Sequence, residues 1–225
     1  MRAVAGVQVR LRTPCTGEHY VTGKLWTRAT IASCPWHADG RCGFSRHGTY
    51  ERVTPIGCHV ARWYCPKTGR TVSALPDCLA AHRTGTLAEL EARLLAVERA
   101  GSLSAAADTM RTEIELPGAL RYLSRLRRDI HGALAIVRGL APERFAGVKP
   151  TITAFALLLG VSGVLMHLRG ECARYLPRLP APLGFDPRRN PRDRTASAPQ
   201  HRSGRDPPHT LVEACVLVHP HDPCA

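Results

Sequence analysis

The sequence predicts an α+β protein: a small β-rich module shaped like a zinc ribbon, then an all-α helix-turn-helix bundle, then a disordered tail. Cys and His gather with Gly and Pro between Cys34 and Pro76, apolar residues recur with helical spacing from Thr86, and apolar residues become scarce after Asp186. We therefore expect a β-rich module over 1–76, a helix-turn-helix module over 77–140, a C-terminal helical segment over 141–185 and a tail over 186–225.

Charge and cysteine content narrow the function classes. The chain has 225 residues and a formal net charge of +13, which favours an anionic partner, nucleic acid before a membrane surface. The first fifteen residues lack the continuous apolar core of a signal peptide, so we expect a cytoplasmic protein. In a reducing compartment, clustered Cys and His are metal ligands more often than disulfide partners.

The segments before the cluster alternate in hydrophobicity. VQVRLR (7–12) and HYVTGKLW (19–26) predict strands that lead into the ribbon, and HGTYERV (47–53) and HVARWY (59–64) predict two strands within it. Cys15 and His19 are separated by three residues, a spacing that could supply a metal ligand, but nothing beside them resembles a ligand-bearing turn, so we interpret them as incidental.

Three cysteines are candidate ligands of a metal ion: Cys34, Cys42 and Cys65. A closed tetrahedral site needs a fourth ligand, for which His37, Cys58 and His59 compete. We assign a zinc site to Cys34, His37, Cys42 and Cys65 and keep Cys58 as the alternative. The other interpretation is a ribbon-shaped hairpin that has lost its metal and is held together by aromatic packing.

A short connector, LPDCLAAHRTG (75–85), follows the ribbon. Cys78 and His82 lie four residues apart and would share one face of a helix, although a cysteine packed as a small apolar residue is the simpler interpretation.

Three helices are expected next. Thr86 and Glu89 form a capping box ahead of an apolar stripe that ends at Gly101, a short Ala-rich helix follows over 104–110, and Pro117 opens a long helix that reaches Leu140. This order of helix, turn, short helix and basic helix is typical of a helix-turn-helix DNA-binding module.

The long helix carries a row of arginines. Arg121, Arg125 and Arg128 project together, with Arg127 beside them, and can reach phosphates or base edges. The expected buried side consists of five apolar residues, Leu120, Leu123, Leu126, Ile130 and Leu134. The alternative is a solvated face of an ordinary bundle helix.

An almost uncharged stretch, Ile152 to Leu168, could suggest a membrane span. It is short for one and is interrupted by glycines, so we expect a buried helix, or two with a break near Gly160.

Several short motifs together resemble the N-terminal region of bacterial insertion-sequence transposases and their orphan relatives. The matching segments are Cys34-Pro35, Arg46-His47-Gly48-x-Tyr50-x-Arg52, Arg62-Trp63-Tyr64-Cys65-Pro66, Gly69-Arg70-Thr71 and Leu75-Pro76-Asp77. The resemblance implies a zinc ribbon, with Cys34, Cys42 and Cys65 as ligands, followed by a helix-turn-helix. It also implies that both modules bind DNA. The family's last ligand falls at Thr68 or Gly69, where this chain has none. We add Arg46 and Arg52 of the matching motif to the candidate DNA contacts.

No catalytic pattern accompanies these motifs. The acidic residues of the helices do not form the metal-binding pattern that strand transfer needs, and adjacent Cys58 and His59 on a strand would face opposite ways. We therefore predict a non-catalytic DNA-binding protein, an accessory subunit, regulator or remnant, without a small-molecule substrate or membrane association. Its expected partners are DNA and either a second copy or a transposase catalytic subunit. The alternative is a helical protein-interaction module that does not bind DNA.

Overall fold

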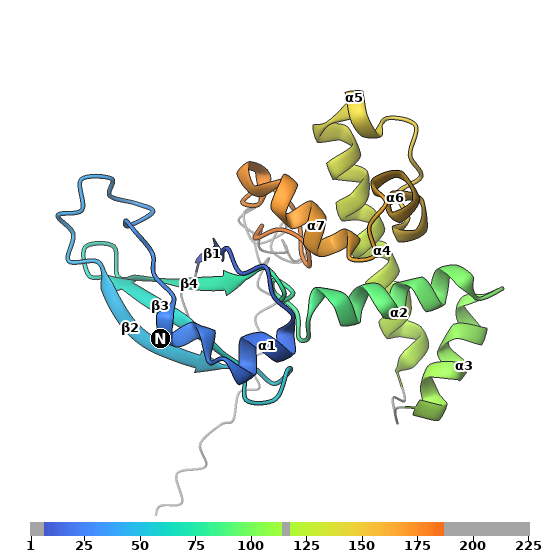
Figure 1. Cartoon of the computed structure of the whole chain (residues 1–225), viewed down its shortest axis with the longest axis horizontal. Coiled ribbons are helices and arrows are strands. Elements are labelled where there is room, and N and C mark those ends of the chain that lie inside the picture. Colours follow the sequence, from blue (N-terminus) through green and yellow to red (C-terminus); the bar gives the residue numbers. More distant parts are fainter. Residues whose placement is uncertain (1–6, 114–117, 187–225) are drawn as a thin grey trace, which may run out of the picture. The chain divides into compact units, whose positions relative to one another are not determined.

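The computed structural model describes residues 7–113 and 118–186 of the chain. They contain one four-stranded sheet, whose strands are β1 (Val7–Leu11), β2 (Ser45–Glu51), β3 (His59–Cys65) and β4 (Arg70–Pro76), followed by a set of helices (Figure 1). The α+β class is confirmed. All described residues belong to one compact unit, so the divisions predicted at 76 and 140 remain predictions. Apart from Asp186, the predicted tail lies outside the described residues.

The sheet has the order β1-β4-β3-β2. β2, β3 and β4 form an antiparallel meander, and β1 pairs in parallel with β4, Val9 opposite Ala74. The strands expected at 7–12, 47–53 and 59–64 are confirmed to within a few residues. β4 was not predicted, because most of its residues are buried and it shows no alternation of apolar and polar side chains.

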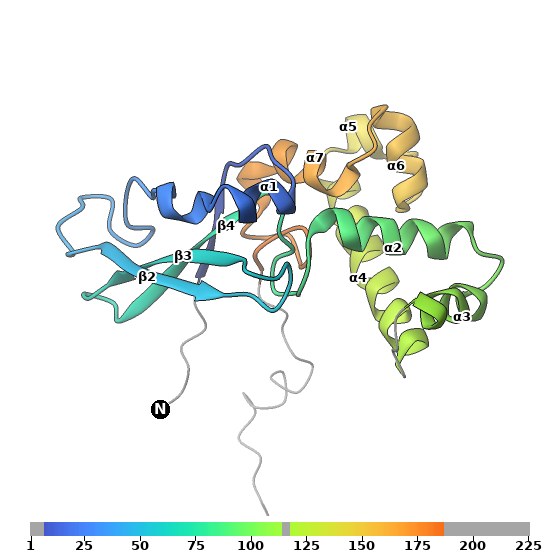
Figure 2. The same ribbon diagram turned by 60° about the horizontal axis from the view of Figure 1, so that its bottom comes forward.

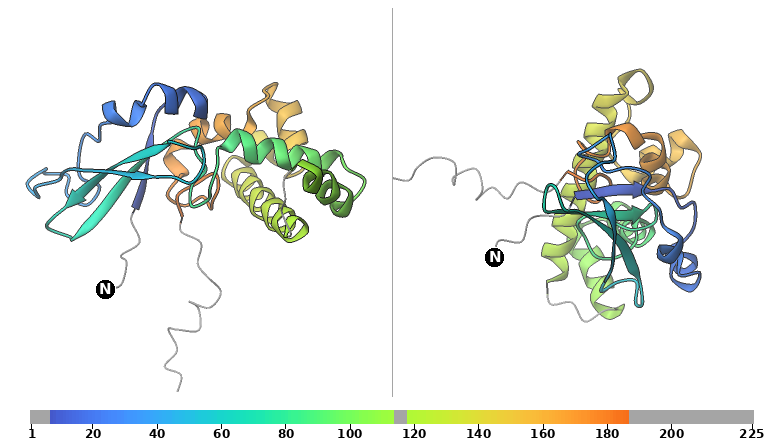
Figure 3. Two further views of the ribbon diagram at one scale, coloured as in Figure 1. Left: turned by 90° about the horizontal axis from the view of Figure 1, so that it is seen from below. Right: turned by 90° about the vertical axis from the view of Figure 1, so that its left-hand side faces the viewer.

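The strand predicted at 19–26 is wrong. This segment forms helix α1 (Gly17–Thr22) and the 3-10 helix η1 (Leu25–Arg28), and the Thr16 side chain accepts a hydrogen bond from the His19 amide at the start of α1. Tyr20 and Trp26 are buried with ring centroids 5.8 Å apart, and Trp26 lies 5.2 Å from the ring of His59 on β3. α1 and η1 therefore cover one face of the sheet (Figure 2, and Figure 3, left).

The connector after β4 contains turns instead of a helix, so Cys78 and His82 do not share a helix face. Cys78 is 3 % exposed within the main core, as expected for a cysteine that packs as a small apolar residue. His82 has a φ of 50°, and its Nε2 lies 3.1 Å from the carbonyl oxygen of Phe185.

Three helices follow the connector: α2 (Leu87–Arg99), α3 (Leu103–Glu113) and α4 (Ala119–Leu140). The capping box of Thr86 and Glu89 is confirmed, and each of the three helices contacts the other two. On α4 the expected apolar side is buried except for Leu120, which is 44 % exposed and was wrongly placed in the core. Pro117, the predicted start of this helix, lies outside the described residues.

The apolar segment is broken as expected. The segment forms two helices, α6 (Ile152–Leu159) and α7 (Val164–Glu171), and α6 ends at Gly160, which has a φ of 64°. The single turn α5 (Pro142–Phe145) precedes them, and the 3-10 turn η2 (Ala173–Tyr175) follows. Within 7–113 and 118–186, no single helix is long and apolar enough to cross a membrane; α6 and α7 pass that test only as a pair, bent by 67°.

Two glutamates of α2 hold the beginnings of α6 and α7. Glu91 accepts hydrogen bonds from the amides of Val164 and Leu165, both at 2.9 Å, and burial raises the pKa of its carboxyl. Glu98 accepts from the amides of Ile152 (2.8 Å) and Thr153 (2.9 Å). Each carboxylate satisfies amide groups that the first turn of a helix leaves without partners.

Glu98 is also bonded by side chains. The Thr153 hydroxyl donates to it at 2.6 Å, and His131 Nε2 on α4 lies 3.0 Å from it. Burial by itself would raise the pKa of Glu98, but the hydrogen bonds from His131, Thr153 and Ile152 outweigh it and lower the pKa to about 2.

Replacing Glu98 by glutamine should therefore weaken the acid dependence of stability. A carboxyl whose pKa is lower in the folded than in the unfolded chain contributes stability that is full above its unfolded pKa and is lost as the pH falls toward its folded pKa. Between pH 6 and about pH 3.5, the wild type should lose about 1 kcal/mol more unfolding free energy than Glu98→Gln, measured by urea titration. Glu143→Gln, at an exposed position, is the control and should follow the wild type; an unchanged pH dependence in Glu98→Gln would contradict the prediction.

Arg169 of α7 connects the helices to the end of the sheet. Its side chain is fully buried, and it donates to the carbonyls of Leu183 (3.0 Å), Pro182 (2.6 Å) and Asp77 (3.2 Å) and to those of Pro76 and Leu79. Burial lowers the pKa of this guanidinium to about 9, although the negative charge of Asp77 acts in the opposite direction.

The carboxylate of Asp77, just after β4, binds the first strand. It accepts from Arg10 Nε at 2.6 Å and from Arg10 Nη2 at 3.0 Å. It also accepts from the Thr13 amide at 3.3 Å, so one residue fixes both the end of β4 and the end of β1.

Candidate metal centre and arginine surface

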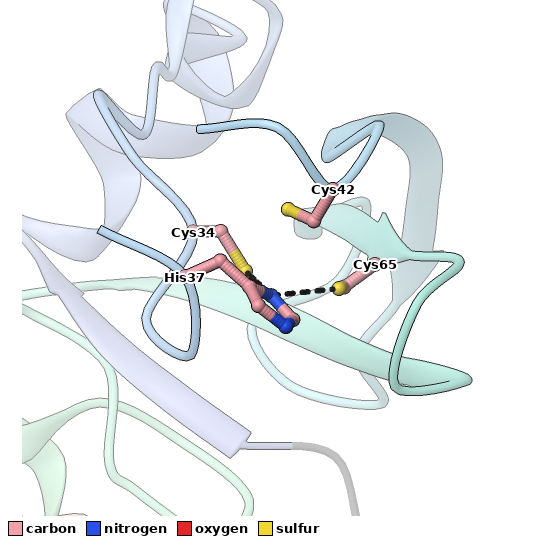
Figure 4. Close-up of side chains that lie close together, drawn as sticks. All are labelled: Cys34, His37, Cys42 and Cys65. Atoms are coloured by element: carbon pink, nitrogen blue, oxygen red, sulfur yellow. Dashed lines mark hydrogen bonds between the residues drawn. The ribbon is translucent and has the colours of Figure 1, made fainter. Parts of the chain in front are cut away.

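Four side chains predicted to bind a metal meet at one end of the sheet. Cys34, His37 and Cys42 come from the loop between η1 and β2, and Cys65 is the last residue of β3 (Figure 4). Their ligand atoms all lie within 4.8 Å of one another. The chain thus supplies three ligands from one loop and one from the strand, and the group can hold a metal ion.

The spacing of these atoms fits a tetrahedral ion. His37 Nδ1 lies 3.5 Å from Cys34 Sγ and 3.5 Å from Cys65 Sγ. For metal–sulfur and metal–nitrogen bonds of about 2.3 and 2.0 Å, the two ligand atoms of a tetrahedron are about 3.5 Å apart. Both distances measured from His37 match that edge, before any adjustment of the side chains.

The loop is folded to bring its ligands together. Cys34 and His37 form an isolated bridge, with the His37 amide donating to the Cys34 carbonyl at 3.3 Å. The three cysteines are buried and form an apolar cluster separate from the main core, against which Trp36 and Phe44 pack. Arg70 of β4 lies over the Trp36 ring, 5.9 Å from its centroid, and closes the outer side of the loop.

Thr68 offers no ligand of its own but supports the neighbouring ligand Cys65. Burial would raise the pKa of the Cys65 thiol, but hydrogen bonds from the side chain and amide of Thr68 and from the other two thiols outweigh it and lower the pKa to about 6. Burial, with the neighbouring Cys34, raises the pKa of Cys42. The site therefore favours a thiolate at Cys65, and the thiolate is the form of cysteine that binds metals.

The two competing ligands lie elsewhere. Cys58 is fully buried in the main core, where burial raises the pKa of its thiol to about 11. The ring of His59 packs on Trp26. Of the fourth ligands that the sequence left open, the structure places His37 with the three cysteines and places Cys58 and His59 apart from them.

The arginines predicted on the long helix are exposed. Arg121, Arg125, Arg127 and Arg128 all lie at the surface of α4, whereas the opposite side of the helix is buried. Arg128 is 3.5 Å from Asp129, yet its side chain remains 71 % exposed. Asp129 also pairs with Arg83 of the connector, which ties α4 to the residues that follow the sheet.

Arg46 and Arg52, the other predicted DNA contacts, have structural partners. Arg46 donates to the carbonyls of Trp26 (2.6 Å) and Thr27 (2.9 Å) and lies over the ring of Trp63. Arg52 donates to the carbonyls of Ala80 (3.1 Å) and Arg83. Both guanidinium groups hold loops to the sheet; Arg46 is exposed and Arg52 is half-buried, and their role as DNA contacts stays a prediction.

In comparisons with known proteins, no family model, no curated protein and no solved structure matches this chain.

Proposed function

We propose that this protein binds double-stranded DNA through the exposed arginines of α4, and that a structural zinc ion stabilises the sheet beside the helices. The observation that supports it best is the division of α4 into a buried apolar side and a surface with four arginines. We further propose that it acts without catalysis, as an accessory or regulatory relative of transposase N-terminal regions, with DNA and a transposase catalytic subunit or a second copy as partners.

The proposed zinc would be structural. Three thiols and one imidazole are the ligand set of closed structural zinc sites, whereas catalytic sites keep a position open for water. The fourth place in this group is taken by His37, and the cysteines are buried. Zinc bound here would fix the 29–44 loop against the turn between β3 and β4, and would not take part in a reaction.

The three helices α2, α3 and α4 support the DNA part of the proposal. Each contacts the other two, and Arg93 of α2 donates to the Tyr122 hydroxyl of α4 at 2.8 Å, next to Arg121. A long helix held by two shorter ones, with cations along its outer side, is the arrangement by which helix-turn-helix proteins present a helix to the major groove.

A second candidate, a protein-interaction module, is favoured by one observation. Leu157 and Leu158 on α6 are 86 % and 49 % exposed, and Met166 on α7 is 38 % exposed. Association without DNA affinity would support this candidate in place of DNA binding.

Replacing Arg121, Arg125 and Arg128 together by alanine should abolish most duplex binding. Each arginine that neutralises a phosphate contributes about 0.9 to the slope of log affinity against log salt. We expect at least about a tenfold loss of affinity and a slope reduced by about 3, measured by fluorescence anisotropy with a random-sequence duplex at several salt concentrations.

The control has the same loss of charge at other exposed positions. Arg12, Arg28 and Arg178 lie outside α4, and their triple alanine variant should keep nearly the wild-type affinity. Equal losses in the two triple variants would show that only net charge matters and would contradict the assignment of α4.

A further inference from the structure

The face of the sheet opposite α1 carries aromatic and arginine side chains at its outer half. The strand register places Gly48 opposite Arg62, Ser45 opposite Tyr64, and Tyr64 opposite Thr71. α1, η1 and Trp63 lie on the other face, and Figures 2 and 3 show no described helix over this one at its outer end. We name His47, Tyr50, Arg62, Tyr64 and Thr71 the stacking face.

A β-bulge brings two aromatic residues of β2 to this face. In a regular strand, His47 and Tyr50 would point to opposite faces because they are three residues apart. The pairing of β2 with β3 shifts between Arg46 and Gly48, where Gly48 has a φ of 107°. This extra residue leaves Arg46 over Trp63 on the covered face, and puts Tyr50 near Arg62 and His47 near Tyr64.

The side chains of the stacking face lie close to one another and are not fully buried. The His47 and Tyr64 rings are 5.5 Å apart at an angle of 39°, and the Arg62 guanidinium lies 5.7 Å from the Tyr50 centroid. Arg62 also donates from Nη2 to the Thr71 hydroxyl at 3.1 Å. His47 is exposed, and the other members are partly exposed.

Arg62 has an unused donor. Its Nε is buried and has no hydrogen-bond partner among the described residues, although Nη2 of the same guanidinium donates to Thr71. A buried donor without a partner is uncommon in proteins and points to a group that completes the site. A phosphate or base oxygen reached by a small rotation of this guanidinium would satisfy it.

We propose that the stacking face binds single-stranded nucleic acid, with unpaired bases stacked on Tyr64, His47 and Tyr50 and a phosphate beside Arg62. Aromatic rings and guanidinium planes on a sheet accept bases of any sequence, and cations nearby hold the backbone. Lys67, in the turn that follows Tyr64 and Cys65, is exposed, and the chain as a whole is strongly basic, so the charge suits a polyanion. Paired bases in a duplex do not offer their faces, so a duplex cannot use this site.

The test compares three fluorescent probes on the full-length protein by anisotropy: an oligothymidylate of about 15 nucleotides, an abasic strand of the same length, and a duplex. The wild type should bind the oligothymidylate more tightly than the abasic strand. Tyr64→Leu and His47→Ala should each weaken oligothymidylate binding by between about 5-fold and 150-fold, and Tyr64→Phe should retain it, because phenylalanine also stacks.

Matched variants separate this site from the α4 surface and from misfolding. Tyr175→Leu changes another partly exposed tyrosine that lies against an arginine, Arg174, and should leave oligothymidylate binding unchanged. The Arg121, Arg125 and Arg128 triple variant should lose the duplex and keep the preference for oligothymidylate over the abasic strand. His47 is exposed, so its replacement should not disturb folding. Equal affinity of the two single strands for the wild type, or unchanged binding by His47→Ala, would overturn the proposal.

Discussion

Replacing Cys65 by serine should leave the purified protein with little zinc and an open loop over residues 34–44. Cys65 is the one ligand of the group that comes from the sheet, and hydrogen bonds lower the pKa of its thiol to about 6. Apparent binding free energies of structural zinc sites are about 10–16 kcal/mol in peptides, so loss of a ligand should cost several kcal/mol locally. Zinc content by mass spectrometry should fall from one ion per chain, and amides of the loop should exchange at least about tenfold faster.

Cys58→Ala provides the matched control. Cys58 is a buried cysteine that immediately precedes β3, but it lies in the main core and not in the metal group. This variant should lose stability by cavity formation and keep one zinc per chain. A wild-type protein without zinc, or a Cys65→Ser protein that keeps a full ion, would contradict the proposed site.

Replacing Arg169 by methionine should cost about 3–5 kcal/mol of unfolding free energy. Methionine fills a similar volume but donates no hydrogen bond, so five buried carbonyls from residues 76–79 and 182–183 would lose their shared donor. Removing the guanidinium also removes the free-energy cost of burying its charge, a cost that is reflected in its lowered pKa. The expected loss is therefore smaller than the sum of five hydrogen bonds. Denaturant titration followed by circular dichroism measures the change.

Arg174→Met is the control for that substitution. Arg174 is an exposed residue one turn further along, and its replacement should change the unfolding free energy by less than about 0.5 kcal/mol. If Arg169→Met were within 1 kcal/mol of the wild type, the guanidinium would not be what joins α7 to the end of the sheet.

The metal group was largely predictable because few residue types bind metals well. Cys34, Cys42 and Cys65 could be chosen from chemistry and spacing, but the sequence could not decide between His37, Cys58 and His59. That choice depends on how the chain folds: the loop brings His37 Nδ1 within 3.5 Å of Cys34 and Cys65, whereas Cys58 is buried in the main core. The same holds for the arginines: the sequence does not show that Arg46 on β2 reaches backbone carbonyls and the Trp63 ring, whereas Arg121 lies exposed on α4.

Local sequence predicted the helices better than the strands. The capping box of Thr86 and the glycine at 160 are signals within a few residues of the helix ends they determine. The segment 19–26 alternates like a strand, yet a cap at Thr16 and the burial of Tyr20 and Trp26 make it helical. β4 pairs with β3 on one side and with the distant β1 on the other, and the pairing with β1 leaves no pattern in the local sequence.

The carboxylates of Glu91 and Glu98 imply an order of assembly. α6 and α7 have eight residues each, and helices of that length are hardly populated alone in water. Their first turns are completed by side chains that α2 supplies about fifty residues or more earlier in the chain. We therefore expect α6 and α7 to form only after α2 has folded. A fragment that begins after α4 should not be helical.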